Sequence, residues 1–241
     1  MRPCIGLTCQ FLLRKTDDRH IPHLALNAAY FDAVTAAGGL PLPLPHCHQP
    51  DQIGQLLSLV DALVFTGGRD ILPERLGQIL HPNSELMHPR RDSFEFELFA
   101  QADRLCLPIL AICLGCQFVN VARGGSIYQH LYDAPRDCQI DHGTAAQRSM
   151  HRVSINPDCQ LAAIMQSTQI EINSSHHQSV DRPGRDLRIV AKAPDGIVEA
   201  IEDPKRPFLV AVQWHPEDMP DIPAQMALFR ALIHAARHRQ R

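Results

Sequence analysis

The chain has 241 residues, of which 45% are hydrophobic and 20% are charged, and its formal net charge is -3. This composition is typical of a globular protein and gives no electrostatic reason to expect a nucleic-acid partner. Because no apolar run approaches a membrane span and no signal-peptide core precedes the first strand, we expect a cytoplasmic protein without a membrane partner, whose eight cysteines are mostly reduced.

Short apolar runs alternate with helical patterns, which predicts an α/β fold with a mostly parallel central sheet covered by helices. The expected strands are Cys4–Thr8, Ala62–Thr66, Pro108–Cys113, Val153–Ile155, Ile170–Asn173, Leu187–Ala193, Ile197–Glu202 and Leu209–Trp214. The expected helices are His23–Ala37, Arg90–Leu105 and Pro223–Ala236. We expect one domain over residues 1–241, because we find no convincing linker between these elements.

Glycine and proline mark the boundaries of several elements. Gly38-Gly39 fits the end of the first helix, where a left-handed residue is favoured. Pro41, Pro43 and Pro45 cannot form a central strand, so they predict an edge segment that enters a loop. Residues 71–90 are rich in proline and polar side chains, which indicates a long loop over one end of the sheet, where it frames a site.

The segment around Cys113 indicates a nucleophile. An apolar strand runs into Cys113, a helical pattern begins directly after it, and Ala111 and Gly115 are small. This is the form of a nucleophile elbow, in which the helix N-terminus favours the thiolate and the N–H of Leu114 faces a developing oxyanion. Two other interpretations stay open: a buried structural cysteine, and a redox pair with Cys116, whose context lacks the neighbours typical of thioredoxins.

A second candidate site lies directly after the last strand. His215 and Glu217 flank Pro216, and in extended backbone their side chains project to the same side. A thiol nucleophile needs a base and a carboxylate that orients it, and sheets of this class bind ligands at strand ends. The motif therefore predicts an oriented His–Glu pair that acts with Cys113.

Another histidine motif could suggest a metal. His46-Cys47-His48 has alternating ligand types in a proline-rich loop, but such residues rarely converge on one ion without further partners. The adjacent His176 and His177 call for the same caution. We therefore expect no metal site and no cofactor.

The chain resembles the class I glutamine amidotransferase domain and, more narrowly, the gamma-glutamyl-gamma-aminobutyrate hydrolase group, which is peptidase C26-like. The resemblance covers nearly the whole chain. It is carried by the segments 111–117 and 213–217 together with 65–70, 91–95, 124–126, 173–178 and 193–200. It implies a flavodoxin-like three-layer α/β sandwich.

The resemblance also implies hydrolysis of a gamma-glutamyl amide through a thioester, in polyamine or related nitrogen catabolism. Cys113 would attack, His215 would act as base and then acid, and Glu217 would orient His215. The backbone N–H groups of Gly68 and Leu114 would form the oxyanion hole, and a glycine at position 68 allows close approach of the substrate.

The small-molecule gamma-glutamyl substrate would contact three further residues. The resemblance assigns this pocket to Gln117, His177 and Gln178, whose alternative interpretation is ordinary hydrogen bonding in a helix turn and a loop. The sequence departs from the hydrolase group at Leu114, where that group often has arginine, and at Leu76, where it often has an aromatic residue.

These departures leave two other functions open. Leu114 is what many ammonia-channelling amidotransferases carry, so a glutaminase subunit that serves a separate synthetase is the main alternative. A binding or regulatory protein on a retired enzyme fold is the third interpretation, because a fold does not guarantee activity. A homodimer is an open alternative to a monomer.

Overall fold

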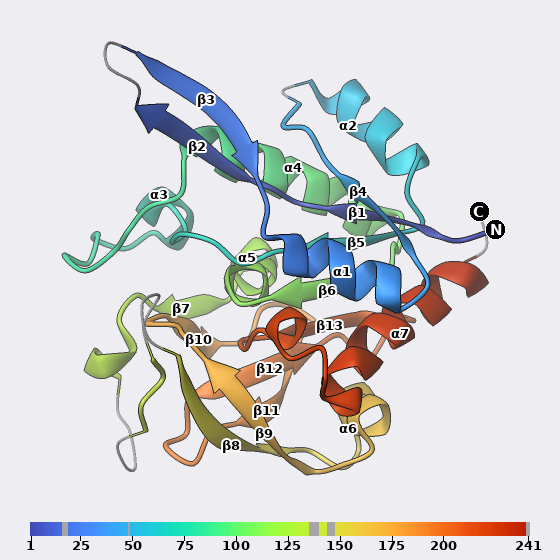
Figure 1. Ribbon diagram of the computed structural model, residues 1–241. Helices are drawn as coiled ribbons and strands as arrows, with labels where there is room; N and C mark the ends of the chain where they lie inside the picture. Colours follow the sequence, from blue (N-terminus) through green and yellow to red (C-terminus); the bar gives the residue numbers. More distant parts are fainter. Residues whose placement is uncertain (16–18, 48, 135–139, 144–147, 240–241) are drawn as a thin grey trace.

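A nine-stranded sheet forms the centre of the computed structural model, in the order β4-β1-β5-β6-β13-β12-β11-β8-β9 (Figure 1). Its strands are β1 (Cys4–Leu7), β4 (Leu40–Pro43), β5 (Ala62–Phe65), β6 (Ile109–Ile112), β8 (Ser149–Ile155), β9 (Gln169–Ser174), β11 (Arg188–Lys192), β12 (Val198–Glu202) and β13 (Leu209–Val212). Pairing is parallel from β4 to β13 and antiparallel from β13 to β9. The structure describes residues 1–239 except 16–18, 48, 135–139 and 144–147.

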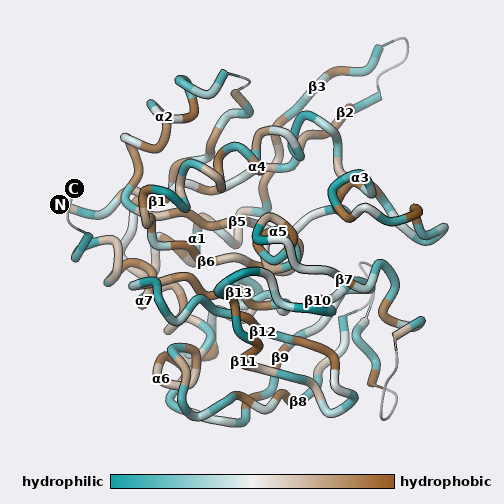
Figure 2. The backbone as a smooth tube through the Cα atoms, turned by 180° about the vertical axis from the view of Figure 1, so that it is seen from behind, coloured by the Kyte–Doolittle hydropathy of each residue, from teal (hydrophilic) through white to brown (hydrophobic). Residues whose placement is uncertain are grey.

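Helices cover both faces of this sheet. One face carries α1 (Ala28–Ala36), α6 (Gln160–Met165) and α7 (Pro223–His238), and the other carries α2 (Pro50–Ser58), α4 (Pro89–Arg104) and α5 (Leu114–Ala122). Alternate strand residues enter the two cores: in β5, Val64 packs with the first group and Phe65 with the second. The central strands are accordingly hydrophobic (Figure 2). This arrangement confirms the predicted flavodoxin-like α/β sandwich.

Smaller elements surround the sheet. They are the ribbon of β2 (Gln10–Lys15) and β3 (His20–Ala25), the ribbon of β7 (Ser126–Tyr128) and β10 (Ser179–Arg182), the helix α3 (Pro73–Leu76), and the 3-10 turns η1 (Leu131–Asp133) and η2 (Pro216–Asp218). The β2–β3 ribbon projects from the sheet (Figure 1). Among the described residues, no helix combines the length and apolar character needed to cross a membrane.

The helix predicted at His23–Ala37 is wrong in its first part. Residues 20–25 form β3 and pair antiparallel with β2, and the helix begins only after Asn27. The Asn27 side chain accepts a hydrogen bond from the N–H of Ala29, which is an N-cap signal visible in the sequence. The other end agrees with the prediction, since Gly38 has a φ of +91° directly after the C-cap.

The other predicted strands and helices are present, but part of the sheet is antiparallel, which was not predicted. Each of the eight expected strands overlaps an observed strand. The proline segment forms β4 at the outer edge of the sheet. The antiparallel half from β12 to β9 was not expected, because apolar strand runs do not reveal the direction of pairing.

Candidate active site

Cys113 lies in a strained turn between β6 and α5. Its φ of 54° and ψ of -108° are unusual for a residue with a side chain, as a nucleophile elbow requires. Gly115 is required in this turn, because a Cβ there would lie 2.3 Å from the carbonyl oxygen of Phe65. Gln213, which sequence reasoning did not assign, donates to the Cys113 sulfur at 3.7 Å. The turn therefore presents the sulfur at the carboxyl ends of the strands.

His215 joins Cys113 to Glu217. The Nδ1 atom of His215 donates to Oε1 of Glu217 at 2.7 Å, and the same ring interacts with the Cys113 side chain. The expected extended backbone is not found: residues 216–218 form the 3-10 turn η2, which nevertheless brings the two side chains together. Burial opposes the charge of His215, but Cys113 and Glu217 outweigh it and raise the pKa of the imidazole well above its usual 6.5.

Two residues that sequence reasoning did not assign hold this arrangement. Asn173 accepts from the backbone N–H of His215 at 2.9 Å and donates to its carbonyl oxygen at 2.8 Å. The hydroxyl of Tyr30 accepts from the N–H of Gly67 at 3.0 Å, and burial together with the nearby Glu217 carboxylate raises the pKa of this tyrosine well above its usual 10. Tyr30 thus lies between the carboxylate and the loop that follows β5.

The buried side chain of Arg91 holds the loop that follows β5. Arg91 donates to the carbonyl oxygens of Thr66 at 3.1 Å and Gly67 at 3.2 Å, and pairs with Glu95 at 2.8 Å. Gly68, the next residue of this loop, lines the pocket, and Leu114 begins α5 directly after Cys113. Sequence reasoning quoted Arg91 only as part of a motif and gave it no role.

Most of the site residues named from the sequence line one pocket of about 740 Å³, but Leu114 and Glu217 do not. Those that line it are Gly68, Cys113, Gln117, His177, Gln178 and His215. Glu217 is buried behind His215. The pocket is also lined by residues that were not predicted, among them Asp70, Glu85 and Arg148. Asp70 accepts from His177, and burial competes with this hydrogen bond, which raises the pKa of His177.

The structure also places the long loop 71–90, Cys116 and the His46-Cys47-His48 motif. Asn83 and Glu85 of the loop 71–90 line the pocket, which confirms that this loop frames the site. Cys116 packs in the core on the α4 and α5 face, whereas Cys113 packs with the opposite core. The Nε2 atom of His46 donates to the carbonyl oxygen of Cys9 at 3.0 Å, and His48 lies outside the described residues.

A larger depression of about 990 Å³ lies at the other end of the parallel strands. Pro108 and Phe208, which precede β6 and β13, line it together with residues of α6 and α7. Ligands of such sheets bind at the carboxyl ends of the strands. The pocket that holds Cys113 is therefore the stronger candidate, despite its smaller volume.

The fold and this geometry define a class of protein: an α/β sandwich with a cysteine at a strand-to-helix elbow and a His–carboxylate pair after a separate strand. The model of the Peptidase C26 family matches residues 3–217. The chain belongs to the Peptidase C26 family, as its resemblance predicted.

Several proteins are similar over most of their length. A Mycobacterium tuberculosis protein that carries a provisional glutamine amidotransferase name is 37% identical, with 98% of this chain and 75% of that protein covered. The gamma-glutamyl-gamma-aminobutyrate hydrolase of Escherichia coli (strain K12) is 30% identical, with 88% and 87% covered. The solved structure of the Trypanosoma brucei CTPS glutaminase domain superposes with a TM-score of 0.65 over 99% of this chain and 95% of that chain. At 17% sequence identity, this similarity shows a shared fold.

Proposed function

We propose that this protein hydrolyses a gamma-glutamyl amide, such as gamma-glutamyl-gamma-aminobutyrate, through a thioester on Cys113. The observation that carries the proposal is the connection from the Cys113 sulfur through His215 to Glu217, with a 2.7 Å bond between the last two. Family membership and the E. coli relative's name support the choice of bond. The cellular place we propose is polyamine or related nitrogen catabolism.

The first half of the reaction forms the thioester. The Cys113 thiolate attacks the amide carbonyl carbon, and the carbonyl oxygen becomes an oxyanion opposite the N–H groups of Gly68 and Leu114. The imidazolium of His215 then gives its Nε2 proton to the leaving nitrogen, the C–N bond breaks, and the amine departs. The raised pKa of His215 supports this role, because it keeps the acid protonated beside the thiolate.

The second half releases glutamate. His215, now neutral, takes a proton from water, whose oxygen attacks the thioester carbon. The C–S bond breaks, the thiolate of Cys113 returns beside the imidazolium, and the glutamate carboxylate leaves. Glu217 accepts from Nδ1 throughout and stabilises the imidazolium, while Tyr30 and Asn173 position the pair.

Pocket residues would hold the glutamyl group. Gln117 and Gln178 already bond through their amide groups, to the Gln178 carbonyl oxygen at 3.0 Å and the Gln129 carbonyl oxygen at 3.1 Å respectively. Their orientation is therefore set before substrate binds, as a selective pocket requires. We assign Gln117, Gln178 and His177 to binding of the glutamyl part.

A screen of gamma-glutamyl compounds tests the proposal. Purified protein is incubated with gamma-glutamyl-gamma-aminobutyrate, related gamma-glutamyl amides and glutamine, and glutamate release is compared with Cys113→Ala. We expect release from at least one amide by wild type alone. No release from any compound, with the thiol shown to be intact, would refute the proposal.

A glutaminase subunit is the second candidate, favoured by Leu114 and by the names of several relatives. Leu114 is buried and packs beside Gly68 instead of lining the pocket, so it offers the substrate no charge. This candidate predicts that glutamine is the best substrate and that a copurifying synthetase raises the rate. Preference for a larger amide without a partner would exclude it.

A further inference from the structure

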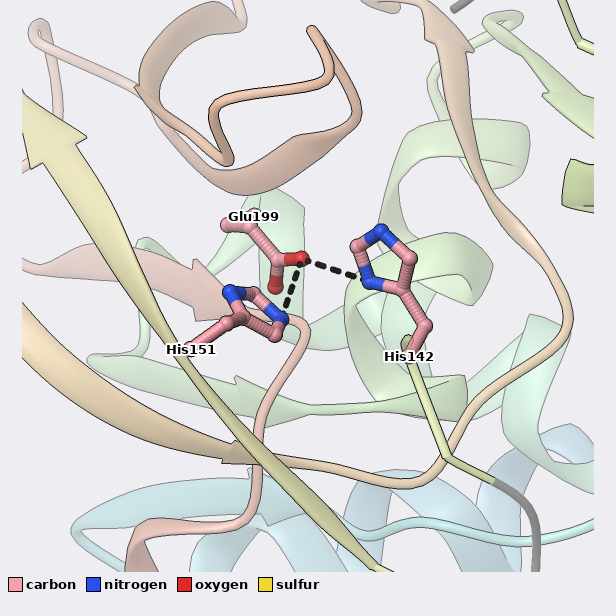
Figure 3. Close-up of side chains that lie close together, drawn as sticks. All are labelled: His142, His151 and Glu199. Carbon is pink, nitrogen blue, oxygen red and sulfur yellow. Dashed lines mark ion pairs between the residues drawn. The ribbon is translucent and has the colours of Figure 1, made fainter. Parts of the chain in front are cut away.

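A cluster of buried ionisable side chains lies in the antiparallel half of the sheet, and one of its members, His176, also lines the pocket that holds Cys113. His142 precedes β8, His151 lies in β8, His176 lies in the β9–β10 connection, and Glu199 lies in β12. Their exposed fractions are 0%, 7%, 5% and 0%. Figure 3 shows His142 and His151 both turned toward the Glu199 carboxylate. None of these four residues has a part in the proposed reaction.

The outer nitrogen of each ring faces an oxygen that can only accept. The three contacts are His142 Nε2 to Asp195 Oδ2 at 3.0 Å, His151 Nδ1 to the Arg152 carbonyl oxygen at 3.1 Å, and His176 Nδ1 to the Gln178 carbonyl oxygen at 2.9 Å. Each outer nitrogen therefore carries a proton. A neutral imidazole has only one N–H, so each inner nitrogen presents a lone pair.

The three inner nitrogens converge on one carboxylate oxygen. His142 Nδ1 lies 3.3 Å from Glu199 Oε1, and the Nε2 atoms of His151 and His176 each lie 3.6 Å from it. These inner nitrogens and both Glu199 oxygens have no hydrogen-bond partner among the described residues. Lone pairs that face one another in a buried space are costly unless something positive lies between them.

Extra protons alone would satisfy the cluster poorly. The His142 ring centroid lies 4.8 Å from that of His151 and 4.9 Å from that of His176, so several imidazolium charges would repel one another.

We propose that His142, His151, His176 and Glu199 form a closed structural zinc site. Zinc takes nitrogen and oxygen ligands at about 2.0–2.1 Å in a tetrahedron, whose edge is then about 3.3 Å. The separations from Glu199 Oε1 of 3.3, 3.6 and 3.6 Å are close to this edge. Ligand atoms of His142, His151 and Glu199 lie within 4.8 Å of one another, and His176 approaches this group of three through its 3.6 Å contact with Glu199 Oε1.

The surroundings suit a divalent cation in two further respects. Histidine ligands of zinc donate their other N–H to a carbonyl or carboxylate oxygen, as all three rings do here. The charge of Zn²⁺ would also be partly neutralised by the buried Glu199 carboxylate, which costs less than burying either charge alone. The ion would tie β8 and β12 to the connection that carries His177 and Gln178 to the pocket.

Metal content and its dependence on single ligands test the site, independently of the proposed hydrolysis. The full chain, expressed without a histidine tag, is given excess Zn²⁺, dialysed against metal-free buffer and analysed by mass spectrometry for metals. We expect about one Zn²⁺ per wild-type chain and at least a tenfold loss of bound Zn²⁺ in His151→Gln. The matched control is His234→Gln, which removes an exposed histidine. Its ring centroid lies 4.4 Å from that of His238, so this pair could bind adventitious ions.

The proposal is overturned if wild type retains no Zn²⁺, if His151→Gln retains as much as wild type, or if His234→Gln loses it. If His151→Gln does not fold, wild type alone still decides. Dipicolinate should lower its Tm, and Zn²⁺ but not Mg²⁺ should restore it; Co²⁺ at the site should give the visible absorption of a tetrahedral ion. If neither the chelator nor Zn²⁺ changes the Tm, the cluster is a network of protonated side chains and not a zinc site.

Discussion

The molecule contains two histidine–carboxylate arrangements that differ in what the second ring nitrogen faces. In the pocket, His215 bonds Glu217 through one nitrogen and interacts with the Cys113 sulfur, so a proton can move along the line. In the buried cluster, three rings bond outward and turn lone pairs toward Glu199. The first arrangement suits proton transfer and the second suits a fixed cation. Residue types alone do not distinguish these two roles.

The largest effect is expected from the nucleophile. Cys113→Ala should reduce glutamate release by at least about 10³-fold, because no other group can form the thioester. The exposed Cys106 provides the control, since Cys106→Ala removes a thiol far from the pocket. Steady-state kinetics and selective alkylation of the thiol measure the difference. Comparable rates in Cys113→Ala and wild type would contradict the role given to Cys113.

Removal of the pocket carboxylate should affect chemistry far more than stability. Glu217→Gln should lower kcat by about 10³–10⁴-fold, because the imidazolium loses its stabilising charge and its preferred tautomer. The exposed Glu171 gives the matched control Glu171→Gln. If kcat stays within tenfold of wild type, Glu217 does not orient His215.

The buried carboxylate should show the opposite pattern. Glu199→Gln should lower the free energy of unfolding by about 3–5 kcal/mol, because it removes the charged centre of a buried group of interacting side chains. Its loss in kcat per folded molecule should be much smaller than that of Glu217→Gln. Urea unfolding measures the first quantity and active-site titration normalises the second. Unchanged stability would mean that nothing cationic faces Glu199.

Tyr30→Phe should give a moderate effect on both quantities. The change leaves the N–H of Gly67 without its acceptor and removes a hydroxyl from beside Glu217, so we expect about a tenfold loss in kcat and about 1 kcal/mol in stability. Tyr128→Phe removes a hydroxyl from a residue that does not line the pocket and serves as control. A tenfold loss in the control as well would show that kcat falls with any loss of stability and not specifically with the loss of the Tyr30 hydroxyl.

The smallest effect concerns pH. Burial lowers the pKa of His215, but Cys113 and Glu217 raise it above 6.5, so the stabilisation it gives is complete below about 6.5 and is lost as pH rises through the folded pKa. In Cys113→Ala one of the raising groups is absent, so the loss should begin at lower pH. NMR titration of the His215 ring in both proteins measures this shift. An identical pKa in both would show that the sulfur and the ring do not interact.

Local signals in the chain were sufficient for the elbow and the His–Glu pair. Cys113 follows an apolar strand and is followed by Gly115, and His215-Pro-Glu217 follows another strand. In both segments a few neighbouring residues are enough to predict the local geometry. Tyr30 and Asn173 carry no such signal, because their partners Gly67, Glu217 and His215 are brought near only by the assembled sheet.

The buried cluster depends on antiparallel register, which sequence patterns do not encode. His151 stands opposite Ile172 in β9, and this pairing sets how the β9–β10 connection carries His176 toward β12. The ligand atoms come from four separate places in the chain, whereas metal motifs are recognised by short spacings. The closely spaced histidines of His46-Cys47-His48 were more conspicuous in the sequence for that reason.

The outer edge strand β4 has a consequence for self-association. The N–H groups of Leu40 and Leu44 bond to Pro3 and Leu7 on the β1 side, so the intervening Pro41 and Pro43 occupy the positions where a strand would offer donors outward. Proline has no N–H to offer. A second molecule therefore cannot prolong the sheet by docking its own strand there, and aggregation through this border is blocked by the covalent structure of the backbone.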